Sequence, residues 1–284
     1  MTQIKSGLLL ASKNAATGQI LYTWRLTYPR IILSENLTHR VFSRNTSSTR
    51  AIPTMKMIRA VLSDMFIPNH IGSAQKGMSA GVELTGFKRV LAASVWESAG
   101  YAASFFAYLL YKLGVAKQIA GRLVEPFSWV TQIVTATDVA NFLLLRNHKD
   151  TEPHFHELAE QMQEQVDLVR VVFEYMERES VESQGLCQIL QPGQWHIPFI
   201  KPTEKYGVEI AKRISAARCA RTSYTLLDTG RETSMQADIN LCDKLFGGDI
   251  KHLSPAEHQA MAMEQDVYSA NFRSFKQFRK ELEA

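Results

Sequence analysis

The sequence predicts an α+β fold, a helix-rich domain with a small mixed or antiparallel sheet. Apolar residues recur at three- and four-residue steps over 82–113, and 152–179 is rich in strong helix formers, so both segments are predicted to be long helices. Two segments rich in β-branched and aromatic residues, 18–34 and 126–135, predict strands. Helix therefore dominates, with few strands.

The elements of the first half follow in order. The strand over 18–34 contains Pro29, which marks an edge or a break. A polar, basic stretch follows it, and Pro53 then opens a helix over 54–66. Glycine, asparagine and serine make 67–82 a loop. The long helix over 82–113 contains many small residues, which suits either a core helix or an interface, and Gly114 ends it.

The second half is predicted to be mostly helical. A helix over 116–123 precedes the strand over 126–135, and Thr137 or Asp138 can cap the helix that ends at Arg146. Glycines and prolines in 183–204 predict a linker or surface excursion. Further helices are expected over 207–220 and 234–246, with a last short helix starting at Ser254.

Composition excludes several classes of protein. The chain has 284 residues, 45% hydrophobic and 21% charged, with a net charge of +4, as expected for a folded soluble domain. No run of basic residues indicates nucleic-acid binding, and no segment has the apolar length of a membrane span. Three widely spaced cysteines indicate neither a disulfide framework nor a metal site and fit a protein of the reducing cytoplasm.

The stretch 38–50 (THRVFSRNTSSTR) is the most informative in the chain. It combines a histidine, three arginines and six hydroxyl side chains. Arginine offers planar, permanently charged donors that suit phosphate, and serine and threonine add short donors. The stretch therefore predicts a site for a multiply anionic small molecule, such as a nucleotide or a flavin phosphate.

Three groups of residues resemble the motifs of flavin-dependent thymidylate synthases. His39, Arg40, Ser48 and Arg50 keep the spacing of the family signature, although Thr38 replaces its first arginine. Arg122 four residues before Pro126, and the segment 141–146 (NFLLLR), resemble a second motif, with Gly121 in place of an alanine.

The third group of motifs is out of order. Segments 220–224 (ARTSY) and 252–258 (HLSPAEH) resemble motifs that normally precede the arginine signature. The resemblance implies a circularly permuted, phage-type member. It divides the single domain 1–284 into a core (1–180), a linker (181–206) and a permuted segment (207–284).

The resemblance implies FAD-dependent methylation of dUMP to dTMP, with 5,10-methylenetetrahydrofolate as carbon donor and NADPH as reductant, in a homotetramer. Arg146 would be catalytic and would stabilise the charge of the activated pyrimidine. The implied dUMP residues are Ser47, Ser48, Arg50, Arg122 and Arg146; the implied FAD residues are His39, Arg40, Asn141, Ser223, Ser254 and Glu257; His252 would contact folate. The three cysteines are expected to be ordinary buried residues, not nucleophiles.

Each motif also has a structural interpretation. Ser254 and Glu257 form a capping box by themselves, Arg146 could complement a helix dipole, and 38–50 could be a polar loop. The functional interpretation is preferred because several independent patterns agree on one family. Glu35, Thr46 and Thr137 also depart from the family pattern, and Arg44 or the segment 271–279 could replace the lost cations.

Three alternatives remain open at this stage. One is a folate-dependent hydroxymethylase that acts on dUMP or dCMP with the same fold. Another is a non-catalytic protein that binds flavin or nucleotide. The third is a helical interaction module with a basic loop.

Overall fold

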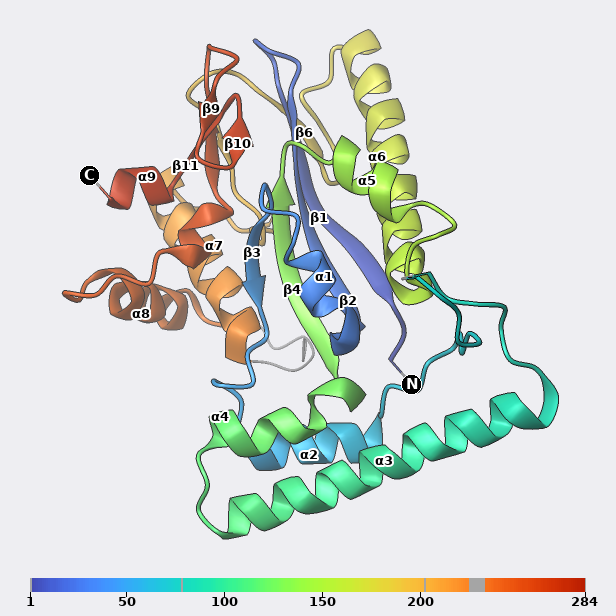
Figure 1. The fold of residues 1–284 in the computed structure, drawn as a ribbon. Helices are drawn as coiled ribbons and strands as arrows, with labels where there is room; N and C mark the ends of the chain where they lie inside the picture. The colour runs from blue at the N-terminus through green and yellow to red at the C-terminus, as the bar shows by residue number, and fades with distance from the viewer. Residues whose placement is uncertain (1, 78, 202, 225–232, 284) are drawn as a thin grey trace.

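The computed structural model describes residues 2–77, 79–201, 203–224 and 233–283. A six-stranded sheet in the order β3-β4-β2-β1-β6-β5 forms its centre (Figure 1). The strands are β1 (Lys5–Asn14), β2 (Ile20–Pro29), β3 (Ser43–Thr46), β4 (Trp129–Ala136), β5 (Ser183–Gln184) and β6 (Cys187–Leu190). Neighbours pair antiparallel except β1 and β6, which are parallel, so the sheet is mixed as predicted.

Helix α6 (Pro153–Arg178) covers one face of this sheet, and α5 (Ala140–Arg146) lies beside it (Figure 1). Side chains alternate along β2, so Tyr22 and Trp24 pack into the core cluster that includes the buried face of α6. Leu21 faces the other way and joins a second cluster with the C-terminal strands. The alternation of apolar residues in β2 is therefore explained by two packed faces.

The other face of the sheet is covered by the C-terminal third of the chain. A three-stranded sheet in the order β11-β8-β7 and a two-stranded β9–β10 ribbon lie there. Their bounds are β7 (Trp195–His196), β8 (Ala260–Ala262), β9 (Tyr268–Ser269), β10 (Phe272–Arg273) and β11 (Phe275–Gln277), with the short helices η4 (Ser254–Glu257) and α9 (Arg279–Leu282) at either end.

A buried chain of hydrogen bonds joins the two sheets. His196 from β7 contacts Ser12 Oγ at 2.6 Å and Thr23 Oγ1 at 2.7 Å. Thr23 Oγ1 lies 2.8 Å from Thr135 Oγ1, which contacts His258 Nδ1 at 2.8 Å. All five side chains are fully buried. Burial lowers the pKa of both histidines to about 3, so both rings are neutral and each ring nitrogen is satisfied by a neutral partner.

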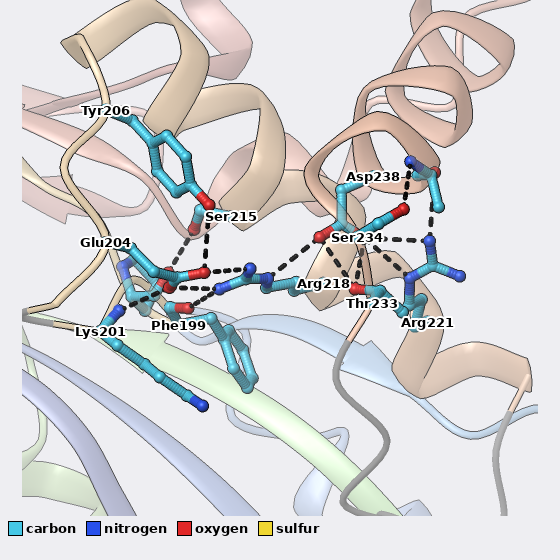
Figure 2. A network of polar contacts seen from close by, with 12 residues as sticks. Phe199, Lys201, Glu204, Tyr206, Ser215, Arg218, Arg221, Thr233, Ser234 and Asp238 are labelled. Carbon is cyan, nitrogen blue, oxygen red and sulfur yellow. Dashed lines mark hydrogen bonds and ion pairs between the residues drawn. The ribbon is translucent and has the colours of Figure 1, made fainter.

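Helices α7 (Val208–Arg221) and α8 (Met235–Phe246) are held together by a network of ion pairs (Figure 2). Arg218 pairs with Glu204 at 2.6 Å and with the buried carboxylate of Asp238 at 3.1 Å. Asp238 also accepts from Arg221 at 2.9 Å and from Thr233 at 2.7 Å. Because a buried carboxylate needs several donors, Asp238 fixes the angle between the two helices. The short helix η3 (Thr222–Tyr224) follows α7.

A satellite layer lies at the end of the sheet where β4 begins (Figure 1). It contains α2 (Thr54–Ser63), the long α3 (Gly86–Lys112), α4 (Lys117–Ala120) and the 3-10 helix η2 (Gly121–Phe127). A separate apolar cluster that includes Met57, Ala107 and Phe127 holds these helices together. The connection from β2 to β3 contains η1 (Arg30–Ile32) and α1 (Leu33–Asn36).

The structure confirms the α+β class, the strands of 18–34 and 126–135 and the long helices of 82–113 and 152–179. It differs in several places. The strand β1 was not predicted, because its serines and alanine obscure the alternation. The predicted linker 181–206 contains β6, which joins the main sheet, and β7. The helix over 116–123 continues as 3-10 helix after Ala120.

The helix after β4 begins differently from the prediction as well. Its N-cap is Val139, not Thr137 or Asp138, and no side chain caps it. Thr137 Oγ1 accepts a bond from the backbone nitrogen of Arg273 instead, at 3.0 Å. No helix within the described ranges combines the length and apolar character that crossing a bilayer requires.

The buried histidines predict acid lability. In the unfolded chain their pKa is about 6.5, whereas the folded pKa is about 3. Stability is therefore fully present above pH 6.5 and is lost as pH falls from there toward 3, by about 2 kcal/mol per histidine at pH 5. Urea unfolding at pH 7.5 and pH 5 measures the loss. His258→Gln should reduce the pH-dependent loss, and His148→Gln, at an exposed site, should not. An unchanged midpoint between the two pH values would contradict this account.

Candidate active site

Arg146, at the end of α5, is held by residues of the 38–50 motif and α1. Its Nε donates to His39 Nε2 at 2.9 Å, and its Nη2 donates to Thr38 Oγ1 at 3.4 Å. Nη1 lies 3.6 Å from Glu35 Oε2, and the guanidinium lies over the ring of Phe155 at 4.8 Å. The first and second motifs, about a hundred residues apart, therefore meet at one side chain.

The electrostatics of this cluster keep His39 neutral. Burial, together with the smaller effects of the charges on Arg146 and Arg44, lowers the pKa of His39 to about 4. A neutral ring can accept the Arg146 bond at Nε2, which leaves the proton on Nδ1. Burial raises the pKa of Glu35, although the charge of Arg146 opposes this shift. Arg146 thus remains the dominant cation, oriented by neutral His39 and balanced in part by Glu35.

The third group of motifs packs against β3. The Ser48 amide donates to the Ser223 carbonyl at 3.1 Å. With its amide in the favoured orientation, Asn45 donates to the Ser254 carbonyl at 3.1 Å and to His258 Nε2 at 3.2 Å. Segments 220–224 and 252–258, far from the 38–50 motif in sequence, are therefore its direct neighbours in space.

The loop after β3 brings a second set of cations together. The Arg50 side chain is exposed, and Arg122 is 61% exposed with a long contact of 3.8 Å to Glu125. A Cβ at Gly121 would lie 3.9 Å from the Thr49 carbonyl oxygen, so the backbones beside Arg50 and Arg122 are in contact. Lys117 Nζ donates to the Ala51 carbonyl at 3.1 Å and adds a third cation. Three exposed cations at one loop suit a phosphate.

Ser47, assigned to the nucleotide by resemblance, is buried and already bonded. Its carbonyl accepts from Arg30 Nη2 at 3.2 Å, and its hydroxyl accepts from the Thr131 amide at 3.2 Å. Arg30 also donates to Ser128 Oγ at 3.2 Å. Ser47 thus supports the loop, and Ser48, half-buried beside it, is the more accessible hydroxyl.

The residues assigned to FAD and folate are mostly open to solvent. Arg40, Asn141, His252 and Ser254 are exposed, Ser223 is half-buried, and within the described ranges no hydrogen bond engages their side chains. Glu257 differs, because its carboxylate pairs with Arg279. Nearby, Arg44 donates to the His39 carbonyl, while its buried Nε has no partner among the described residues. Open donors and an unsatisfied cation fit an anionic cofactor, whereas Glu257 is not free to bind one.

The C-terminal segment returns to the motif, as the sequence suggested. Gln277 donates to Ser43 Oγ at 2.8 Å, and Asn271 donates to the same oxygen at 3.3 Å. The charge of Arg273 is committed to Asp266, with bonds of 2.8 and 2.5 Å. Arg44 is therefore better placed than Arg273 to replace the arginine that the family has at position 38, since Arg44 bonds the adjacent residue, His39, and Arg273 is paired with Asp266.

The two groups of cations approach β4 from opposite ends. Arg122 lies in η2, which precedes Trp129, and Arg146 ends the helix that follows Ala136 (Figure 1). Eight residues of strand separate these ends, about 26 Å at about 3.3 Å per residue. The Arg146 side chain shortens this span by reaching back toward Glu35. The three exposed cations (Arg50, Arg122 and Lys117) nevertheless form one part of the site and the Arg146 cluster another, and the two parts are separate within one chain.

Sequence reasoning missed several residues of this region. Lys117 lies outside every motif, and Arg30 gives no signal because a lone arginine after a strand usually faces solvent. Thr135 and His196 could not be assigned, since their roles depend on pairing between strands far apart in sequence. His258 belongs to the third motif, but the capping-box interpretation left its buried role undetected.

Comparisons with known proteins give distant similarity only. No protein-family model and no curated protein matches the chain. The solved structure of the UMP/dUMP methylase PolB from Streptomyces cacaoi bound with 5-Br UMP is 17% identical, with a TM-score of 0.48, over 57% of this chain and 87% of that chain. The same enzyme bound with 5-Br dUMP gives 15% identity and a TM-score of 0.45, over 57% and 89%. Similarities at this level are too distant to assign a function.

The contact between Arg146 and His39 predicts a measurable pKa. Arg146→Ala removes a neighbouring cation and opens the ring to water, so the pKa of His39 should rise from about 4 toward 6.5. Titration of the ring protons by NMR measures this shift. Arg178→Ala, which removes an exposed arginine at the end of α6, should leave the pKa unchanged. A His39 pKa that stays near 4 in the Arg146 variant would contradict the arrangement.

Proposed function

We propose that this protein methylates dUMP to dTMP in an FAD-dependent reaction, with 5,10-methylenetetrahydrofolate as carbon donor and NADPH as reductant. One observation carries the proposal. Three motifs that resemble one enzyme family are scattered along the sequence, and they are neighbours in the fold through Arg146–His39, Ser48–Ser223 and Asn45–His258. Unrelated patterns would have no physical reason to pack against one another.

Arg146 is the proposed catalytic residue. Its guanidinium is fixed by the His39 ring, by Glu35 and by Phe155. A fixed cation stabilises negative charge that develops on the pyrimidine without first having to reorganise. Because His39 is neutral, it orients Arg146 without adding a second charge. The base would therefore lie against α5 and the 38–42 stretch.

Arg50, Arg122, Ser48 and Lys117 are proposed to hold the phosphate and sugar. Each arginine can present two parallel donors to phosphate oxygens, and the lysine adds a compact charge. Their exposure keeps them available: Arg122 uses Nε for the Gln118 carbonyl at 3.2 Å and makes a long contact of 3.8 Å with Glu125, and its side chain is still 61% exposed.

We propose that FAD is held by His39, Arg40, Asn141, Ser223 and Ser254. His252 is proposed to face the folate. Reduced flavin would supply hydride, a step that no protein side chain can perform. His39 already accepts a bond from Arg146, whereas the other side chains have no hydrogen-bond partner among the described residues and suit the diphosphate and ring of the cofactor. The unsatisfied Arg44 Nε adds a donor. Glu257 would bind FAD only after Arg279 releases it.

No cysteine is available as the alternative activating nucleophile. Cys187, Cys219 and Cys242 are all buried, and burial raises the pKa of each thiol. A thiol in this state is poorly nucleophilic. Activation by Arg146 is therefore the route that the described residues support.

A second copy of the chain is proposed to complete each site. The phosphate cations and the Arg146 cluster lie toward opposite ends of β4, which is long relative to a nucleotide. Arginines from two copies could instead line one cleft. A homotetramer in the bacterial cytoplasm agrees with this arrangement and with the family resemblance.

A hydroxymethylase is the second candidate, because two substitutions reduce positive charge near the base. Thr38 replaces an arginine of the family signature, and Glu35 faces Arg146 at 3.6 Å. If water rather than hydride resolves the intermediate, product forms without reductant. Reactions with dUMP or dCMP, each with and without NADPH, separate the two candidates.

Arg146→Lys tests the catalytic assignment. The lysine keeps the charge but loses the planar guanidinium with its several fixed donors. Release of tritium from C5-labelled dUMP should therefore fall at least about a hundredfold. Arg178→Lys, at the end of α6, should retain full activity. Freshly purified wild type should show flavin absorbance that bleaches with NADPH. A colourless protein without tritium release would contradict the proposed function.

Arg50→Ala and Arg122→Ala test the phosphate site. Each change removes a charge-assisted hydrogen bond, so dUMP affinity should weaken roughly tenfold to a hundredfold. Calorimetric titration measures this, and deoxyuridine, which lacks the phosphate, should bind wild type and variants alike. Arg59→Ala, an exposed arginine on α2, is the matched control. Unchanged dUMP affinity in both arginine variants would remove these residues from the site.

A further inference from the structure

Helix α3 exposes an unusual amount of apolar surface. Ten of its large apolar side chains are exposed, whereas its buried residues are the small Gly100, Ser104 and Ala107. In Figure 1, α3 lies along the edge of the molecule, beside α2 and η2. The exposed residues are Phe87, Val90, Leu91, Val95, Tyr101, Phe105, Phe106, Tyr108, Leu109 and Tyr111.

The area of this face matches one side of a protein interface. Six of the ten residues are aromatic, with exposed fractions from 37% to 77%. An aromatic side chain offers about 150–250 Å², so the six rings alone expose on the order of 600 Å². The largest apolar patch of a typical monomer is about 300–600 Å², and each partner in a stable complex buries about 800 Å². With the four aliphatic residues, α3 reaches that second value.

The pattern along the helix is symmetric about its middle. One seam of exposed positions runs along the helix in alternating steps of four and three residues. It consists of positions 87, 91, 94, 98, 101, 105 and 108. Eight of the ten exposed apolar residues are related in pairs about Ser98: Phe87 with Leu109, Val90 with Phe106, Leu91 with Phe105, and Val95 with Tyr101. The small Ser94, Ser98 and Ala102 lie at the centre. Two such helices can approach closely at Ser98 while the large ends interlock.

We propose that α3 pairs with α3 of a second copy of this chain, antiparallel, about a two-fold axis near Ser98. A two-fold axis perpendicular to the helices at Ser98 brings each residue of one copy against the residue equally far on the other side of Ser98 in the partner, so the apolar residues on either side of Ser98 meet one another. Antiparallel pairing also places each helix N-terminus beside the partner's C-terminus, which the helix dipoles favour. This inference gives the assembly of the proposed function a surface and a geometry.

Single cysteines test the geometry directly, because the three native thiols are buried. Ser98→Cys should form a disulfide-linked dimer under mild oxidation. Leu91→Cys and Phe105→Cys should each fail to link alone but should link when the two proteins are mixed. Glu164→Cys, exposed on α6, should not link in any combination. Linking of Leu91→Cys with itself, or no linking by Ser98→Cys, would overturn the proposal.

Mass measurements test the interface without cross-linking. Wild type should sediment at a multiple of 32.1 kDa at micromolar concentration, and Val95→Glu with Phe105→Glu should reduce that multiple with unchanged circular dichroism. Leu168→Glu, on the exposed side of α6, is the control and should keep the wild-type mass. A wild-type mass of 32.1 kDa would overturn the proposal. It would do so whether or not the protein also binds phosphatidylcholine vesicles. A dimer that binds neither flavin nor dUMP would support this interface while contradicting the proposed function.

Discussion

The docking of the C-terminal third onto the main sheet is the constraint on which the rest of the structure depends. Two neutral histidines, His196 and His258, reach into the sheet and bond to Ser12, Thr23 and Thr135. Every member is buried, so an unmade bond in this chain would leave a polar group without water. These hydrogen bonds therefore hold β7, β8 and η4 in one position on the main sheet, because a shift of these elements would break a buried hydrogen bond.

The position of these elements determines what surrounds the 38–50 motif. His258 and Asn45 bring Ser254 to β3, and the Ser48 amide holds Ser223. On the other side of the motif, His39 receives Arg146. The segments 220–224 and 252–258, whose motifs the resemblance places before the arginine signature, thus reach the 38–50 motif from the C-terminal third of this chain. Their order along the chain does not matter once the buried histidines set their place.

Much of this could be read from the sequence, and the rest could not, for identifiable reasons. Apolar periodicity predicts α3 and α6, and β-branched residues predict β2 and β4, because these signals are local. β6 was missed because its pairing with β1 joins residues more than 170 positions apart, and β1 was missed because its serines and alanine obscure the alternation. The motifs predict that Arg146 and His39 belong to one site, but only the fold shows that His39 is neutral and that Ser47 and Glu257 are already bonded.

Hydrogen–deuterium exchange with dUMP and FAD tests the central claim most directly, that these scattered motifs form one ligand site. Amides of 38–50, 141–146, 220–224 and 252–258 should become protected together when both ligands are added. Residues 168–178 at the C-terminal end of α6, more than twenty positions from any motif in the sequence, should exchange as before. Protection that appears in none of these segments, or that is confined to unrelated parts of the chain, would contradict the account.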